Sequence, residues 1–138
     1  MVFTMKTVIT ISSLLLITNA YAEMADVLKV KAQQAEDKTW AFEVTVKHAD
    51  TGWKDYANGW DVLLPDGTIL KLDQKDKFTR TLWHPHVNEQ PFTRSQSGLS
   101  IPDNIKEVTV KAHTTVDGWG GEELKVSLDT ETSKIKND

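Results

Sequence analysis

The chain has 138 residues, with 16 lysines and arginines against 20 aspartates and glutamates, and it contains no cysteine. Because the two signs of charge are interspersed, no basic stripe marks a surface for nucleic acid or anionic lipid, and we expect no nucleic-acid partner. The absence of cysteine excludes disulfides, so any fold has to rest on its hydrophobic core.

The first 22 residues have the pattern of a secretory signal peptide. Lys6 precedes an apolar run at residues 8–17, and a small-residue triplet, Ala20-Tyr21-Ala22, follows it. The run is shorter than the ~20 apolar residues that a spanning helix needs. We therefore expect cleavage after residue 22, a location in the periplasm or outside the cell, and no membrane anchor afterwards.

Removal of the leader would leave 116 residues (138 − 22) with a net charge of −5, because Lys6 is lost and 15 basic residues face 20 acidic ones. This length predicts a single domain. We place the domain at residues 23–129 and expect residues 130–138 to be a frayed polar tail.

The remaining sequence favours short β-strands. Apolar Trp40, Phe42, Val44 and Val46 alternate with more polar residues, which indicates a half-buried strand. Residues 60–64 and 68–72 flank a tight-turn sequence and predict a hairpin. Further strands are predicted at residues 27–31, 78–83, 108–112 and 124–128.

About seven short strands, turn signals about every 10 residues and no helical period predict an antiparallel β-sandwich. The expected type is immunoglobulin-like or fibronectin-like, without the cysteine pair of antibody domains. Residues 84–100 contain two prolines and many polar residues, and form either a long functional loop or a broken edge strand.

Two histidines in this segment suggest a metal site. In an extended chain His84 and His86 point the same way, and paired imidazoles suit Zn²⁺ or Cu²⁺. His48 and Glu89 are the further candidate ligands. The alternative is structural: the imidazoles bond to backbone or carboxylates, and Glu89 and Arg94 form a buried pair that fixes the loop.

Tryptophan is frequent, with five copies. Trp40 and Trp60 follow the strand alternation and are expected in the core. The aromatic and cationic side chains in or beside the loops are candidates for contacting a protein or glycan partner: Trp53, Tyr56, Trp83, Arg94 and Trp119. In the alternative interpretation the loop tryptophans close the ends of the sandwich.

The sequence gives little support for catalysis. It has no G-x-S-x-G and no H-E-x-x-H motif. We therefore expect a binding or accessory protein without enzymatic activity. The open alternative is a hydrolase with a base drawn from Asp55, Glu89 and His84, which would require a concave pocket holding at least two of them.

Three stretches together resemble a group of small exported bacterial proteins: residues 46–53, residues 56–60, and the segment His84-Pro-His-Val-x-Glu-Gln-Pro-Phe-Thr-Arg94. The resemblance spans roughly residues 44–121. It implies a periplasmic bacterial protein, and it assigns no activity, cofactor or catalytic residue.

Overall fold

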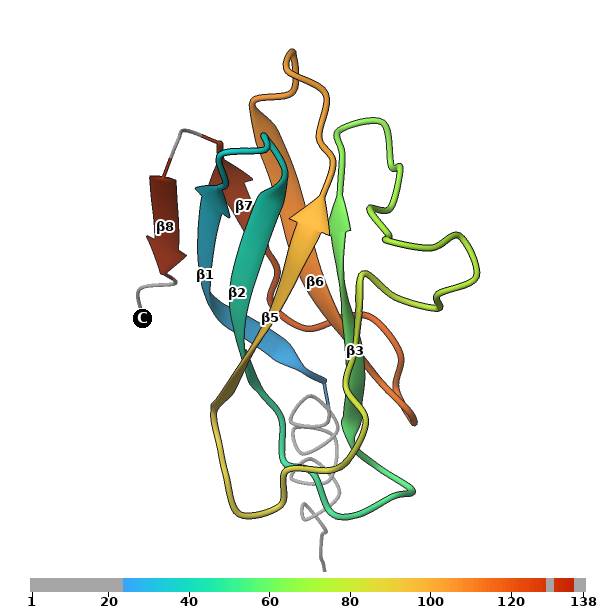
Figure 1. The fold of residues 1–138 in the computed structure, drawn as a ribbon. Coiled ribbons are helices and arrows are strands. Elements are labelled where there is room, and N and C mark those ends of the chain that lie inside the picture. The colour runs from blue at the N-terminus through green and yellow to red at the C-terminus, as the bar shows by residue number, and fades with distance from the viewer. Residues whose placement is uncertain (1–23, 129–130, 136–138) are drawn as a thin grey trace, which may run out of the picture.

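A computed structural model describes residues 24–128 and 131–135. In this part the chain forms only strands: β1 (Asp26–Gln34), β2 (Trp40–Lys47), β3 (Ala57–Leu63), β4 (Arg80–Thr81), β5 (Phe92–Leu99), β6 (Glu107–Thr114), β7 (Leu124–Ser127) and β8 (Glu131–Ile135). They build two four-stranded sheets, β5-β2-β1-β8 and β4-β3-β6-β7, with antiparallel pairing throughout (Figure 1). The predicted antiparallel β-sandwich is confirmed. Its immunoglobulin-like or fibronectin-like type stays a prediction.

The core lies between the two sheets. Phe42, Val44 and Val46 of β2 are fully buried, and Trp60 of β3 lies among them as the largest buried side chain. Burying a side chain of this size stabilises the fold by about 1.5–3 kcal/mol relative to leaving it exposed. The alternation seen in the sequence is therefore the inward face of the sheet.

The segment between β3 and β5 is less regular than predicted. Residues 68–72 form only a bridge to β3, between Leu63 and Ile69, and the strand expected at residues 78–83 is reduced to β4. The Thr79 hydroxyl provides the reason, because it accepts the amide hydrogen of Val62 at 2.9 Å and donates to the Leu70 carbonyl at 2.6 Å. Side-chain bonds thus replace part of the strand pairing.

Each of the two interpretations of residues 84–100, loop and edge strand, is correct for a different part of the segment. Residues 84–91 are a loop, and Phe92–Leu99 forms β5 at the edge of its sheet. Three alternate carbonyls of β5 accept side-chain hydrogen bonds: Thr93 from Arg94 Nη1 (2.7 Å), Ser95 from Arg80 Nη1 (3.1 Å) and Ser97 from Gln96 Nε2 (3.1 Å). Alternate carbonyls of a strand share one edge. The two arginines of the chain therefore help to cover backbone acceptors that would otherwise invite another strand.

The C-terminal segment differs from the expected frayed tail, because residues 131–135 form β8 and pair antiparallel with β1. Backbone pairing with the free edge of β1 requires no apolar sequence, which is why hydrophobicity did not indicate it. The predicted leader, residues 1–22, lies outside the described residues. Within residues 24–128 and 131–135, no helix is long and apolar enough to cross a membrane.

Candidate functional site at one end of the sandwich

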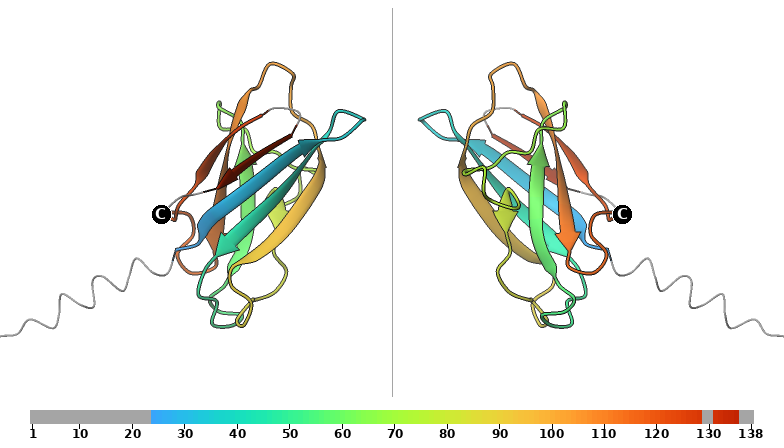
Figure 2. Two further views of the ribbon diagram at one scale, coloured as in Figure 1. Left: turned by 90° about the vertical axis from the view of Figure 1, so that its left-hand side faces the viewer. Right: turned by 90° about the vertical axis from the view of Figure 1, so that its right-hand side faces the viewer.

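Three loops and the entry of the chain into β1 gather at one end of the sandwich. They are residues 48–56, residues 82–91, residues 115–123 and residues 24–25, and we call them the loop end (Figures 1 and 2). The loop end is the lower end in Figure 1. All the predicted site residues except Arg94 lie in the first three of these loops, and Arg94 lies just beyond, in β5.

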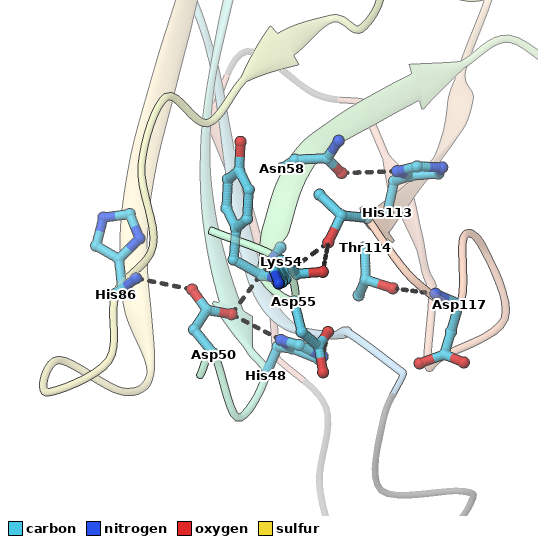
Figure 3. Close-up of polar contacts among 12 residues, drawn as sticks. His48, Asp50, Lys54, Asp55, Asn58, His86, His113, Thr114 and Asp117 are labelled. Carbon is cyan, nitrogen blue, oxygen red and sulfur yellow. Dashed lines mark hydrogen bonds and ion pairs between the residues drawn. The ribbon is translucent and has the colours of Figure 1, made fainter. Parts of the chain in front are cut away.

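Asp50 joins the first two loops. Its Oδ1 accepts hydrogen bonds from His48 Nδ1 at 2.6 Å and from the Ala57 amide at 3.0 Å, while Oδ2 accepts the His86 amide at 2.8 Å (Figure 3). Asp50, His48 and His86 are all buried. Burial alone would raise the pKa of Asp50, but these hydrogen bonds outweigh it and lower the pKa below its ordinary value. The carboxylate is therefore charged at neutral pH and accepts three hydrogen bonds.

Gln90 makes a second bridge between the same loops. Its Oε1 accepts the His48 amide at 3.0 Å, and its Nε2 donates to the His86 carbonyl at 3.0 Å. His48 also has a second carboxylate nearby, since Asp55 Oδ1 lies 3.7 Å from its Nε2. Sequence reasoning missed Asp50 and Gln90 as organising residues. The His-x-Asp spacing at residues 48–50 is the signal that could have indicated Asp50.

The third loop is fixed by Thr115. Its hydroxyl donates to the Lys54 carbonyl at 3.1 Å and accepts the Tyr56 amide at 3.2 Å, while its own amide donates to the Tyr56 carbonyl at 3.0 Å. At the other side of this loop, the Glu122 amide donates to Asp26 Oδ1 at 2.8 Å. The loops thus form one hydrogen-bonded unit.

His86 is held as a neutral hydrogen-bond acceptor. Its Nε2 lies 2.8 Å from Arg94 Nη2, and because a guanidinium only donates, the imidazole nitrogen has to accept. The ring also stacks on Phe92 with centroids 3.9 Å apart. Burial, then the charge of Arg94, then His84 lower the pKa of His86. Its Nδ1, which carries the proton in this tautomer, is buried and has no hydrogen-bond partner among the described residues.

The four predicted metal ligands do not form a common shell. His84 and His86 are neighbours, with ring centroids 4.6 Å apart. His48 is engaged by Asp50, and Glu89 lies 3.4 Å from Arg94 Nη2. Across residues 24–128, no group of three or more His, Asp or Glu side chains is arranged to hold a metal ion.

The Glu89–Arg94 pair exists, but it is not the buried pair that was expected. The Glu89 side chain is 61% exposed and that of Arg94 is 31% exposed. Solvent screens such a pair, so it contributes little to stability. Arg94 contacts the loop mainly through its hydrogen bond to His86. It also donates to the Thr93 carbonyl of its own strand.

Large apolar side chains are exposed on the loop end. Trp53 is 68% exposed, Trp83 72%, Val87 52% and Val116 62%. We call these four residues the apolar rim. Among the described residues the fifth exposed large apolar side chain is Leu72, which lies outside the loop end and packs near Gly98.

Trp53 is presented by a tight turn. The Asp55 amide donates to the Gly52 carbonyl at 3.1 Å, and the Thr51 amide donates to the Asp55 carbonyl at 3.0 Å. Half-buried Tyr56 meets the Trp53 ring edge-on, with centroids 5.7 Å apart. The indole is therefore exposed on a turn whose backbone is fixed.

Trp119 does not belong to the apolar rim. It is half-buried against the outer face of the second sheet, 4.8 Å from the His113 ring and 5.9 Å from Phe78, with Lys111 over its face. His113 itself bonds through Nδ1 to Asn58 Oδ1 at 2.7 Å (Figure 3). The candidates Trp53 and Trp83 thus lie on the rim, whereas Trp119 packs into a separate aromatic cluster.

Comparison with known proteins gives one distant relative. The chain is 34% identical over 112 residues to a Halomicrobium mukohataei protein named "Putative lipoprotein". The match covers 81% of this chain and 50% of that protein, so the chain spans about half the length of the curated relative. No family model matches the chain, and no solved structure matches it.

Proposed function

We propose that the protein is an exported accessory protein that binds another protein through the apolar rim. The observation that carries the proposal is the concentration of four exposed large apolar side chains on one end of the sandwich. The predicted leader and the name of the Halomicrobium mukohataei relative support export. Either the periplasm or the exterior satisfies this proposal.

Exposed apolar side chains gathered on one surface indicate an interaction site more strongly than single ones do. Tryptophan is also enriched among the residues that dominate binding energy at protein interfaces. At the loop end the backbone beneath the rim is already fixed by Asp50, Gln90 and Thr115. Binding would therefore cost little further ordering of the loops.

The composition of the rim favours a protein over a glycan. Sugars stack on flat aromatic faces, and Val87 and Val116 offer none. The apolar rim instead combines two tryptophans with two aliphatic side chains, and charged Lys54, Glu89 and Arg94 lie in or next to the same loops. This composition matches an apolar interface with a polar border. A glycan partner is the competing outcome of the experiment.

Site-specific photo-crosslinking in cells of the source organism tests the proposal. A benzophenone amino acid would replace Trp53, Trp83 or, as the matched control, Leu72, which is 57% exposed outside the loop end. We expect the same discrete protein adduct from both rim positions and none from Leu72. A Val87→Asp substitution should abolish the adduct at Trp53 without changing the melting temperature.

Two results would contradict the protein partner. Adducts that are equally strong at Leu72 would show that contact is not specific to the rim. Binding of a purified glycan that is lost in Trp53→Ala but unchanged in Val87→Asp would assign the rim to a sugar.

A Cu²⁺ or Zn²⁺ site remains the second candidate. It is favoured by the 4.6 Å separation of the His84 and His86 rings. Nδ1 of His86 has no hydrogen-bond partner among the described residues, but it would have to lose its proton to bind the metal. Two imidazoles are half of a tetrahedral shell, so Glu89 or His48 would have to leave its present partner. Metal titration of the wild type and of a His84→Ala/His86→Ala variant decides: equal affinities would eliminate this site.

The hydrolase alternative needs a concave pocket that contains two of Asp55, Glu89 and His84. Three hollows in the described part of the molecule are lined by residues other than these three. Asp55 lies instead beside His48. The geometry therefore gives this alternative less support than the other two.

A further inference from the structure

A hollow of about 470 Å³ opens at the end of the sandwich opposite the loop end. It lies between the β1–β2 turn, the segment from residue 101 to residue 106, and Leu128, which follows β7. Its volume falls within the ~300–1,000 Å³ range of small-molecule sites. The hollow shares no residue with the apolar rim.

The exposed lining of the hollow is more polar than apolar, and its apolar part is continuous with the core. Trp40, Ile101 and Leu128 line it, and all three belong to the buried hydrophobic cluster. The pairing of β2 with β5 shifts register here, since Trp40 pairs with Leu99 but Phe42 pairs with Gln96. This irregularity begins at Trp40, which lines the hollow.

The mouth of the hollow carries more positive than negative charge. Lys38 and Lys106 line it together with one carboxylate, Asp103, which gives a balance of +1 (2 − 1). The whole chain has a net charge of −4, so the lining of the hollow is more positive than the chain as a whole. Positive charge at the entrance favours an anionic group on an entering molecule.

Lys38 is also held in an uncommon backbone conformation. Its φ is 76°, in the left-handed region that side chains other than glycine rarely adopt. Gln34, another lining residue, donates from Nε2 to the Lys38 carbonyl at 3.1 Å. A strained, tethered lysine at the mouth of a hollow is the kind of outlier that marks ligand sites.

We propose that this hollow binds a small amphiphile with an anionic head, such as a medium-chain carboxylate. The head lies between Lys38 and Lys106, and the apolar tail lies over Trp40, Ile101 and Leu128. This site is independent of the rim and of the proposed protein partner. Each added methylene that reaches the apolar part of the lining should tighten binding by up to about fourfold, which is the limit for complete burial.

Isothermal titration of the full mature protein with hexanoate, octanoate and decanoate, each below its micellar concentration, tests the proposal. Decyltrimethylammonium, which has the same tail and the opposite charge, is the ligand control. We expect decanoate to bind at least 10-fold more tightly than the cation. Equal affinity for the two, or no binding of decanoate at millimolar concentration, would overturn the proposal.

Variants of exposed mouth residues then test the site itself. Lys38→Glu/Lys106→Glu should weaken decanoate binding at least 10-fold, whereas Lys75→Glu/Lys125→Glu, with the same change in net charge away from the hollow, should not. Asp103→Lys should tighten binding, a gain that unfolding cannot imitate. If Asp103→Lys does not tighten decanoate binding, or if the two double-lysine variants lose equal affinity for decanoate, the carboxylate of the ligand binds elsewhere.

Discussion

Arg94 donates a hydrogen bond from Nη2 to Nε2 of His86 at 2.8 Å, and this contact fixes the protonation state of a buried imidazole. Arginine stays protonated at any pH at which the protein is folded, so His86 can accept this bond only while it is neutral. A proton on His86 would replace the hydrogen bond with repulsion between two cations. The loop that carries part of the apolar rim is therefore sensitive to acid.

The first prediction concerns stability between pH 7 and pH 5. The pKa of His86 is lowered in the folded protein, so as pH falls below about 6.5 the unfolded state takes up the proton first and folding loses stability. The loss from one such group is at most about 1.4 kcal/mol per pH unit. Urea unfolding at several pH values should show a shallower dependence in His86→Gln, whose side chain can accept from Arg94 but cannot gain the proton.

His113 provides the comparison for this measurement. Its pKa is also lowered, by burial first and then by Lys77 and Lys111, but it lies on the second sheet beside Asn58. His113→Gln should likewise flatten the pH dependence, and the two substitutions together should flatten it further. If neither variant changes the slope, the acid sensitivity does not come from these imidazoles.

The second prediction isolates the charge of Asp50. Asp50→Asn keeps the size of the side chain but removes the charge that faces His48, and an amide nitrogen replaces one of the two accepting oxygens. Breaking such a buried network should lower the free energy of unfolding by about 2–4 kcal/mol. Because the pKa of Asp50 is lowered, its contribution should be present at neutral pH and lost as pH falls through and below about 3.8.

Asp66→Asn is the matched control for that measurement. Asp66 also accepts a backbone amide hydrogen, from Thr68 at 2.9 Å, but in an exposed turn. An exposed cap of this kind contributes about 1 kcal/mol or less, and asparagine retains the acceptor. If chemical denaturation shows that the two variants lose equal free energy of unfolding, the buried network stabilises the protein no more than an exposed cap does.

Alternation of apolar residues was sufficient to predict the sandwich, because the inward faces of β2 and β6 are set by a period of two. It did not predict β8, whose pairing with β1 depends on backbone groups. It also overestimated the strands at residues 68–72 and 78–83. There, the Thr79 hydroxyl and the buried Asp61 carboxylate take over backbone bonds that a regular strand would make.

The candidate site was predicted in part. Sequence spacing brought His84 beside His86 and placed Trp53 and Trp83 in loops, and both pairs lie at the loop end. The His-x-Asp spacing could have indicated the bond between Asp50 and His48. The bridges that Asp50 and Gln90 make between the two loops join residues 36 or more positions apart, and no local pattern encodes them. The bonds from Arg80 and Arg94 to carbonyls at the edge of β5 were likewise not predicted.

The third prediction concerns Gly121, a glycine near the end of the third loop. A Cβ at Gly121 would overlap the Ala25 carbonyl, which is backbone and cannot rotate away. Gly121→Ala should therefore force apart the loop and the chain entry and destabilise the protein by about 1–3 kcal/mol. Gly67→Ala is the control, since its φ of +91° is strained for alanine but nothing lies within 4 Å of its Cβ. A Gly121→Ala loss no larger than that of the control would refute the steric argument.

The fourth prediction separates strain from charge at Lys38. Its φ of 76° costs a residue with a side chain about 1–2 kcal/mol, and glycine would relieve this while losing about 0.5–1 kcal/mol through greater freedom in the unfolded chain. Lys38→Gly should therefore raise the free energy of unfolding by up to about 1 kcal/mol, whereas Lys38→Ala, which keeps the strain, should not. Both variants should weaken decanoate binding, because both remove the same ammonium group. If Lys38→Gly gains stability and binding is unchanged, the strain belongs to the turn alone. A gain in stability together with weaker binding would mean that the left-handed conformation is retained for the lysine that it places at the hollow.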